Sequence, residues 1–254
     1  STFNRFLSTP FSILENNQYL DEKISTSNQF ITNSLHYTKY SYYEFIGNTF
    51  SYCKSVGEYK QGGAIYINCE NSQNISQIKV QILNNCFLNC EADQGGSLYI
   101  KCGTAIIEEN LFRNCEAIYY SILYINANKE VTITQTHMFY SNREESTRGN
   151  ATHSISNDQL CEKNLNISSN KLDSSHSIYS ILVPVLGSLP KLLYLIFLNN
   201  TSKDVLSISS PYNTIIENTN FILNQGFDFL IELKTQIRCQ NCAFIKENSK
   251  SIAS

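Results

Sequence analysis

The sequence predicts an all-β protein, a parallel β-helix in which short strands stack coil upon coil in a solenoid. Three observations lead to this prediction. A short word that begins with phenylalanine recurs along the chain, a paired-glycine strand occurs twice in nearly the same form, and no helical period separates the strands. The cleaner copies recur every ~25 residues, which is too short for a domain and typical of stacked supersecondary units.

The recurring word is a phenylalanine followed three residues later by cysteine or asparagine. Its six copies are Phe50 to Cys53, Phe87 to Cys90, Phe112 to Cys115, Phe139 to Asn142, Phe197 to Asn200 and Phe221 to Asn224. We expect the asparagines of this word to lie at turns, where a side-chain amide bonds the backbone of the next coil.

The paired-glycine strands define the first set of stacked positions. Aligning Gly62–Ile67 with Gly95–Ile100 and with the next coil predicts three inward columns. They are Ile65 with Leu98 and Leu123, Ile67 with Ile100 and Ile125, and Cys69 with Cys102 and Ala127. Period-two alternation sends the residues between them to the opposite face. We expect that face to point outward, and it comprises Ala64, Tyr66, Asn68, Ser97, Tyr99, Lys101, Ile122, Tyr124 and Asn126.

A second strand precedes the phenylalanine in each coil. Its apolar residues are Ile78, Val80 and Ile82, then Ile106 and Ile107, then Val131 and Ile133, and finally Ile215 and Ile216. Two or three short strands in each turn, without a helical period between them, favour a parallel β-helix over a leucine-rich or helical solenoid.

The chain divides into four segments of one continuous domain. Residues 1–45 repeat poorly and suit atypical N-terminal coils or a cap, 46–142 are regular coils, 143–192 are degenerate coils or a long loop, and 193–254 are C-terminal coils. The most apolar stretch, Ile178 to Leu198, contains Pro184, Pro190 and Lys191, so we interpret it as buried strands and a turn, with no membrane span in this chain.

Composition limits the function classes. The net charge of -3, without a run of Lys or Arg, gives no electrostatic basis for binding nucleic acid. Nine cysteines that lack paired zinc-ligand clusters favour an oxidising compartment. The chain begins at Ser1 without an apolar leader, and we expect a processed or partial product. We expect neither a metal nor a cofactor.

Stacked coils lie ~4.8 Å apart, a separation that a disulfide accepts. The best candidate pairs Cys69 with Cys102. Cys53, Cys90 and Cys115 form another column that can hold one bridge, and Cys239 and Cys242 could bridge locally. The alternative is a column of reduced, buried thiols that pack as small apolar groups.

Five sequons occur, and their placement separates them. Asn74 and Asn150 lie in polar segments where a glycan could project, whereas Asn200 occupies the turn position of the repeat and is expected to be buried. The candidates for N-glycosylation are Asn74, Asn150, Asn166 and Asn199.

Two further columns bear on function. Tyr66, Tyr99 and Tyr124, one coil apart, would make a flat strip suited to sugar rings or a protein surface, unless the tyrosines simply pair with one another between turns. Glu91 and Glu116 are the best carboxylate pair for a glycosidase. Lys54 holds the equivalent position in the preceding coil, so the simpler interpretation of this column is charge compensation at a solvated turn. The four histidines, His36, His137, His153 and His176, show no metal-ligand spacing.

The repeat resembles that of the chlamydial polymorphic outer-membrane proteins, which are surface adhesins, and of related protist surface proteins. The residues that carry the resemblance are the phenylalanine word and the strand Gly62-Gly63-Ala64-Ile65, over roughly 46–142 and 193–225. The resemblance implies a right-handed β-helix displayed outside the cell. Three of the six asparagine positions are cysteine here, and nothing resembles a membrane-inserting barrel.

These features together predict a non-catalytic, extracellular or cell-surface structural or adhesive protein. Expected partners are further copies, joined head to tail in a fibre through the open ends of the β-helix, or cell-surface glycans or proteins. The alternatives are a polysaccharide lyase or hydrolase that uses Glu91 and Glu116, and a glycan-binding module that uses the tyrosine strip.

Overall fold

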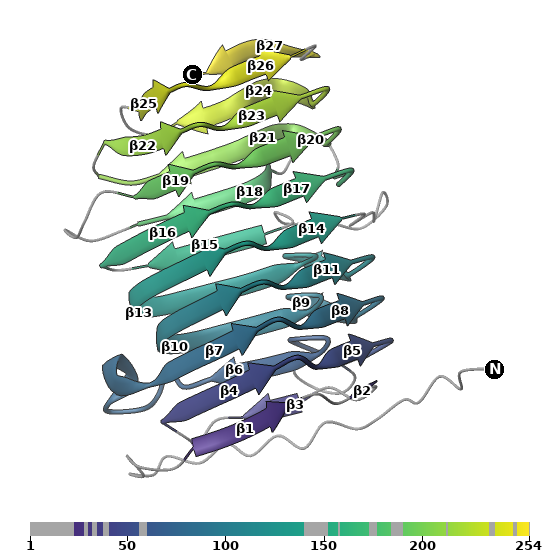
Figure 1. The fold of residues 1–254 in the computed structure, drawn as a ribbon, viewed down its shortest axis with the longest axis vertical. Helices are drawn as coiled ribbons and strands as arrows, with labels where there is room; N and C mark the ends of the chain where they lie inside the picture. Colours follow the sequence, from purple (N-terminus) through teal and green to yellow (C-terminus); the bar gives the residue numbers. More distant parts are fainter. Residues whose placement is uncertain are drawn as a thin grey trace.

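The protein is a parallel β-solenoid in the computed structural model (Figure 1). The structure describes residues 23–27, 30–31, 35–37, 41–55, 60–139, 152–156, 158–172, 177–183, 190–211, 213–233, 237–245 and 248–253. All strand pairings within these residues are parallel. Equivalent positions in adjacent coils lie between 19 residues apart, as for Lys23 and Tyr42, and 37 residues apart, as for Asn48 and Asn85. The predicted fold class is therefore confirmed.

Sheet A is the longest of three sheets and has 16 strands. It bends at Gly103 within β10, where an added Cβ would lie 2.3 Å from the carbonyl oxygen of Ile75, so only glycine fits. Its strands are β1 (Lys23–Ser27), β3 (Leu35–Tyr37), β4 (Tyr42–Ile46), β6 (Ile65–Asn68), β7 (Lys79–Leu83), β10 (Leu98–Glu108), β13 (Leu123–Thr134), β15 (Thr152–Ser156), β16 (Gln159–Lys163), β18 (Ser177–Leu182), β19 (Lys191–Leu193), β21 (Thr201–Ser209), β22 (Thr214–Glu217), β24 (Gln225–Leu233), β25 (Ile237–Gln240) and β27 (Asn248–Ala253).

Sheet B forms a second wall from nine short strands, one for each coil. Its strands are β2 (Phe30–Ile31), β5 (Thr49–Ser51), β8 (Cys86–Leu88), β11 (Leu111–Arg113), β14 (His137–Phe139), β17 (Asn166–Ser168), β20 (Ile196–Leu198), β23 (Asn220–Ile222) and β26 (Ala243–Ile245). Sheet C pairs β9 (Glu91–Gln94) with β12 (Glu116–Tyr119), and one 3-10 turn, η1, spans Ile75–Gln77.

The corners at both edges of sheet B repeat the same two-residue device. A residue with positive φ turns the chain, and the next residue points inward. Asn84 has φ 54 and precedes the buried Asn85, and Asn199 has φ 52 and precedes the buried Asn200. Asparagine tolerates this left-handed conformation better than most residues. The word we placed at turns therefore does lie there, but the left-handed residue is the one before its asparagine.

The inward asparagines form hydrogen-bonded ladders between coils. The Oδ1 atom of Asn224 accepts from the backbone N–H of Asn200 at 3.0 Å, and its Nδ2 atom donates to the carbonyl oxygen of Phe197 at 2.8 Å. Asn200 makes the equivalent bonds to Asn170 and to Ile167. Each amide thus satisfies buried backbone groups that the turn leaves unpaired, as expected for buried polar groups.

Phenylalanines stack in the core beneath sheet B. The ring centroids of Phe50 and Phe87 are 4.9 Å apart and those of Phe87 and Phe112 are 4.7 Å apart, with planes within 5° of parallel. Phe197, Phe221 and Phe244 form a second stack with the same geometry.

One of the six predicted words is out of register. Met138 pairs with Phe112 and is fully buried, whereas Phe139 pairs with Arg113 and points away from the core. Because Met138 and Phe139 are adjacent, they must point to opposite faces, and the register with Phe112 in the neighbouring coil makes Met138 the inward one. Asn142 lies outside the described residues.

Both faces of β6 and of the first part of β10 are covered, which corrects the predicted outward face. The inward column of Ile65, Leu98 and Leu123 is in register and buried, as expected. However, Ala64, Ser97, Ile122, Tyr66 and Tyr99 on the opposite face are also buried. The paired glycines let the neighbouring turn approach closely, since a Cβ on Gly63 would lie 1.9 Å from the carbonyl oxygen of Gly96.

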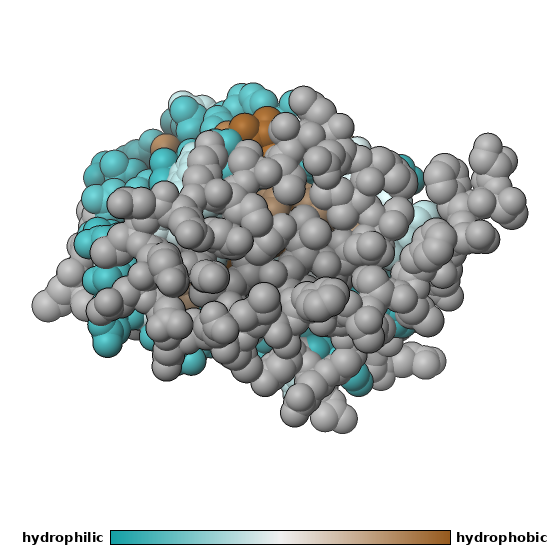
Figure 2. Space-filling model, turned by 90° about the horizontal axis from the view of Figure 1, so that it is seen from below, coloured by the Kyte–Doolittle hydropathy of each residue, from teal (hydrophilic) through white to brown (hydrophobic). Residues whose placement is uncertain are grey.

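The stacking continues through the region where the repeat weakens. Strands β15, β16, β17 and β18 pair in register with β13, β14, β19, β20 and β21, so coils rather than one long loop occupy the described part of this region. The stretch from Ile178 to Leu198 contains β18, β19 and β20, as predicted. Viewed from below, along the stack, much of the coloured margin is hydrophilic, with a small hydrophobic group near the upper rim (Figure 2).

Candidate interaction surfaces

The three tyrosines of the predicted strip form a stack along the solenoid. Tyr66, Tyr99 and Tyr124 are in register, with ring centroids 5.5 and 4.7 Å apart and interplanar angles of 23° and 19°. Tyr120 packs on Tyr124 at 4.8 Å. The rings therefore use their flat faces on one another.

This geometry corrects the expected sugar-stacking strip. Tyr66 and Tyr99 are only 5% and 6% exposed, and burial raises the pKa of Tyr99 to about 12. A sugar ring needs an open aromatic face, whereas these rings turn only their edges outward. The alternative that we weighed, pairing of the tyrosines between turns, is the arrangement observed.

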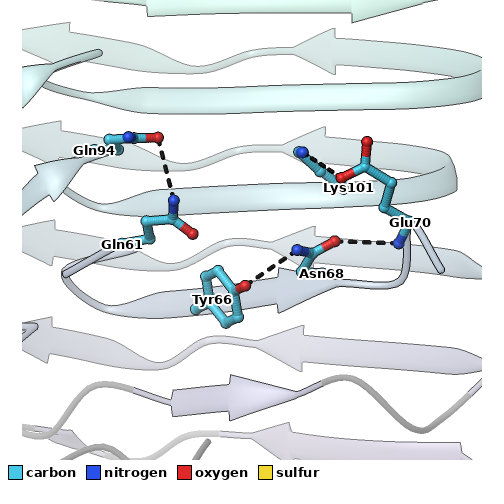
Figure 3. A network of polar contacts seen from close by, with 6 residues as sticks. All are labelled: Gln61, Tyr66, Asn68, Glu70, Gln94 and Lys101. Atoms are coloured by element: carbon cyan, nitrogen blue, oxygen red, sulfur yellow. Dashed lines mark hydrogen bonds and ion pairs between the residues drawn. The ribbon is translucent and has the colours of Figure 1, made fainter. Parts of the chain in front are cut away.

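Polar side chains surround the edge of this tyrosine stack (Figure 3). The Nδ2 atom of Asn68 donates to the hydroxyl of Tyr66 at 3.1 Å, and its Oδ1 atom accepts from the backbone N–H of Glu70. Glu70 in turn forms an ion pair with Lys101 of the next coil. This network links two coils and leaves its carboxylate and ammonium paired with each other.

The carboxylate column also has the predicted register. Glu91 pairs with Glu116 across sheet C, and Lys54 bridges to Glu91. The Lys54 ammonium contacts both carboxylate oxygens of Glu91 at 2.8 Å, with both side chains about a third exposed. An ion pair of this exposure contributes on the order of 0.2–1 kcal/mol. The column therefore has the charge compensation expected of a solvated turn.

All nine cysteines are free thiols, so the predicted bridges are not formed. This applies to Cys69 with Cys102, to the column of Cys53, Cys90 and Cys115, and to Cys239 with Cys242. Burial raises the pKa of the Cys69, Cys90 and Cys102 thiols, which keeps them protonated. The column of reduced thiols, our alternative, is what the structure contains.

The thiols of one column act as hydrogen-bond donors. Cys115 donates to the carbonyl oxygens of Phe87 and Arg113, both at 3.5 Å, and Cys90 donates to Phe50 and Leu88 at 3.9 and 3.7 Å. Asn224 and Asn200 make the same bond to the preceding coil. At this corner the cysteine thiol thus donates the hydrogen bond that the side-chain NH₂ group of asparagine donates elsewhere.

The local pair near the C-terminal end has no sign of redox activation. Cys242 lies at a corner and donates to the carbonyl oxygens of Ile216 and Gln240 at 3.6 and 3.4 Å. Partial burial and the neighbouring Cys242 raise the pKa of Cys239 to about 11. Reactive cysteines need the opposite shift.

The sequons fall into distinct environments. Asn74 caps η1 and is partly exposed, Asn199 is exposed at a corner, and Asn200 is fully buried in the ladder, as predicted. Asn166 begins β17, and its Oδ1 atom is buried without a hydrogen-bond partner. Asn150 lies outside the described residues.

The three histidines whose backbone the structure describes lie on three different strands. His137 is exposed on β14, the backbones of His36 and His153 are in β3 and β15, and His176 is outside the described residues. Among the residues whose placement is described, no three His, Cys, Asp or Glu side chains are arranged to hold a metal ion.

The outer face of sheet B carries few charges and is mostly apolar in its C-terminal half, a feature that the sequence reasoning missed. Two columns project from β5 to β26, on either side of the buried aromatic column. The first column is Thr49, Cys86, Leu111, His137, Asn166, Ile196, Asn220 and Ala243, and the second is Ser51, Leu88, Arg113, Phe139, Ser168, Leu198, Ile222 and Ile245. Arg113 is the only Asp, Glu, Lys or Arg among these outward positions on β5 to β26.

Exposure is greatest in the C-terminal half of this face. Ile196 and Ile245 are 37% and 46% exposed, and the corner residues Tyr194 and Leu223 are 50% and 48% exposed. The signal was present in the sequence, because the residues on either side of the buried phenylalanine must point outward by alternation. The sequence prediction did not use these flanking residues, because it considered only the phenylalanine and the corner residue of each repeat.

No family model, curated protein or solved structure matches this chain. A search of the described residues for an apolar helix of membrane-spanning length found none.

Proposed function

We propose that this protein is a non-catalytic structural and adhesive rod of the cell exterior, which makes its contacts through the outer face of sheet B. The observation that carries the proposal is the register of apolar side chains on that face. Leu198, Ile222 and Ile245 follow one another in successive coils, and Ile196 lies beside them. A partner would meet an apolar side chain in each of these three successive coils.

Such a face gains strength from repetition. A Leu or Ile side chain contributes about 1.5–3 kcal/mol when a partner covers it fully. Several side chains on one stiff scaffold act together, because after the first contact the others are held at high effective concentration. A regular solenoid supplies this stiffness, since the coils are bonded to one another along sheets A and B.

The occupant that this face fits best is a second copy of the chain. The outward positions of β5 to β26 carry one formal charge, at Arg113, and the exposed corner residue Glu109 adds one of opposite sign, so an identical face can approach with little repulsion. Two sheets can pack face to face at about 10 Å with their side chains interdigitated. The outer side of sheet A is different, because Lys163, Lys191 and Glu217 project from it.

End-to-end addition is the second route of assembly that we propose. Strands β1 and β27 are the two ends of the described path through sheet A, and each pairs there on one side. An open strand edge is a template for another strand. Contacts of this kind are heterologous and lead to fibres.

The extracellular location rests on the resemblance of the repeat to surface adhesins and on the exposed sequons at Asn74 and Asn199. The cysteine content no longer supports it, because the thiols at Cys90 and Cys115 are explained by their hydrogen bonds.

The test uses a triple variant of the apolar face, Ile196→Asn with Leu223→Asn and Ile245→Asn. A matched control carries three apolar-to-Asn changes on the outer side of sheet A, Leu83→Asn, Leu193→Asn and Ile215→Asn. Sedimentation velocity of each protein measures lateral association, and retention of protein-coated beads on a layer of the wild-type chain measures adhesion. We expect the triple variant of the apolar face to lose lateral association and adhesion, and the control variant to keep them.

A second assay separates this function from an enzymatic one. The proteins are incubated with a panel of polysaccharides, and product release is measured. Turnover that disappears in Glu91→Gln and in Glu116→Gln would overturn the non-catalytic proposal. Equal association of wild-type and triple variant would overturn the role of the apolar face, and a strict monomer at high concentration would remove self-assembly altogether.

A further inference from the structure

A glutamate lies in the hydrophobic core, in a column that is otherwise aliphatic. Glu162 of β16 is fully buried and pairs with Ile133 of the coil before and Leu192 of the coil after. The same column continues through Ile107 on one side and Ile216 on the other. An ionised carboxylate is costly in such surroundings, and a carboxylate without a counter-charge there takes up a proton instead.

The strand beside it is also polar on its inner side. Three buried residues of β15, Thr152, Ser154 and Ser156, occupy the positions that Leu123, Ile125 and Ala127 fill in the preceding coil. Tyr179 of β18 is in register with Thr152 and is fully buried. Strand β15 and position 162 of β16 therefore present oxygen-bearing side chains to the core where the preceding coil is aliphatic.

Four oxygen atoms of this cluster have no hydrogen-bond partner in the structure. They are both carboxyl oxygens of Glu162, the Oγ atom of Ser154 and the Oη atom of Tyr179, and each is almost wholly inaccessible. Thr152 and Ser156 instead donate to backbone carbonyl oxygens. Unpaired buried oxygens are destabilising, so this coil is less tightly held than its neighbours.

Among the residues that the structure describes, no counter-ion faces Glu162. The residues that point inward from the strands against it are Val131 and Ile133 of β13, Thr152, Ser154 and Ser156 of β15, Ser177, Tyr179 and Ile181 of β18, Leu192 of β19 and Ile167 of β17. Tyr179 is the one titratable group among them, and burial raises its pKa well above the usual value. Cys161 and Lys163 flank Glu162 on the strand and point to the other face.

We propose that the coil formed by β15, β16 and β17 is a pH-sensitive seam in the solenoid, which stays closed while Glu162 is protonated and opens as Glu162 loses its proton. When the coil opens, water solvates the carboxylate of Glu162. The unpaired groups of Glu162, Ser154 and Tyr179 then form hydrogen bonds with water. The coils on either side keep their aliphatic columns. The rod would then flex or separate at this coil, and not at random along its length.

The direction of the effect follows from the two protonation states. Burial raises the pKa of Glu162 to about 8 from 4.5, and the nearby hydroxyls of Tyr179 and Ser154, which lack hydrogen-bond geometry, lower it by less. The closed coil thus holds a proton that the opened coil releases. Its stability is complete below a pH of about 4.5, falls as the pH rises, and levels off above about 8. The opening equilibrium rises up to tenfold for each pH unit in that window.

Hydrogen exchange of the intact chain tests this directly. Exchange of amides in β15, β16 and β18 is measured between about pH 5 and 8 and corrected for the intrinsic rate, with amides of β7 and β10 as the reference within the same molecule. We expect opening of the first group to increase several-fold per pH unit in the wild type. In Glu162→Gln, which is neutral at every pH, the dependence should vanish. Glu116→Gln, at a solvated turn, should leave it intact.

Parallel pH profiles for the wild type and Glu162→Gln would overturn the proposal. If Glu162→Gln does not fold, the wild type alone decides. Infrared spectra of the chain labelled with ¹³C-glutamate should then show a protonated carboxyl band that persists at neutral pH. Its absence would equally overturn the seam.

Discussion

The thiol of Cys115 donates a hydrogen bond to the carbonyl oxygen of Phe87 in the preceding coil, at 3.5 Å. Asn224 makes the same contact with the carbonyl oxygen of Phe197, at 2.8 Å. The two corners are equivalent, so cysteine and asparagine are alternative solutions to one problem, a backbone carbonyl left unpaired where the chain turns. Asparagine also supplies an acceptor, which sulfur provides only weakly.

The first prediction concerns this substitution. In Cys115→Asn the amide keeps the donor to Phe87 and adds an acceptor for the backbone N–H of Cys90, so we expect stability to be unchanged or higher. In Cys115→Val the carbonyl of Phe87 loses its donor, and we expect a loss of about 1–3 kcal/mol. Urea unfolding under reducing conditions measures both.

The matched control is the same pair of changes at the exposed Cys239, where neither should matter. Equal destabilisation by Asn and Val at position 115 would show that the thiol packs there without acting as a donor.

The second prediction separates the two residues of one corner. Asn200→Leu leaves the backbone N–H of Asn170 and the carbonyl of Ile167 unpaired, so we expect it to cost more than ~2 kcal/mol. Asn199→Gly should be neutral, because glycine adopts positive φ without strain, whereas Asn199→Val should be destabilising. Thermal unfolding of the three variants gives the order, and a harmless Asn200→Leu would contradict the ladder.

The third prediction concerns the tyrosine stack. Tyr99→Ser removes a ring packed between Tyr66 and Tyr124, and we expect a loss of about 3 kcal/mol, as for other large-to-small changes in a core. Tyr99→Phe keeps the stack and should cost less than ~1.5 kcal/mol. Chemical unfolding tests this, and calorimetry with oligosaccharides serves as the second readout. A Tyr99→Ser protein of normal stability that has lost sugar affinity would restore the glycan-binding interpretation.

The fourth prediction concerns glycosylation in a eukaryotic secretory host. We expect glycans at Asn74 and Asn199, which are accessible, and none at Asn200, which is buried in the ladder. We expect lower occupancy at Asn166, whose side chain is partly covered. Site-resolved mass spectrometry reports each position. An occupied Asn200 would mean that this corner is open in the folded chain.

The sequence was sufficient for features that repeat locally. The inward columns that contain Ile65, Leu98 and Leu123 were predicted from alternation and repeat spacing, and they have that register. Alternation alone could not place Phe139, because it and Met138 satisfy the pattern equally until the neighbouring coils fix which of them is inward.

The candidate sites were harder to predict, because each depends on what lies above, below and beside a residue. Tyr66 belongs to a face that the pattern calls outward, yet the coils close over it. The thiol of Cys90 has the spacing of a disulfide but is engaged with the carbonyl of Phe50. Glu162 was not noticed in the sequence, where a single glutamate between apolar residues has no distinctive signal.

The sequence by itself determined that the chain winds into stacked parallel coils, with aromatic and corner positions in columns, because periodicity and turn chemistry act between near neighbours. Only the tertiary structure decided which side chains those columns cover, which thiols donate, where an apolar face is left open, and that a carboxyl group is sealed in the core. The physical reason is that burial and partnership are set by the adjacent coils, 19 to 37 residues away along the chain.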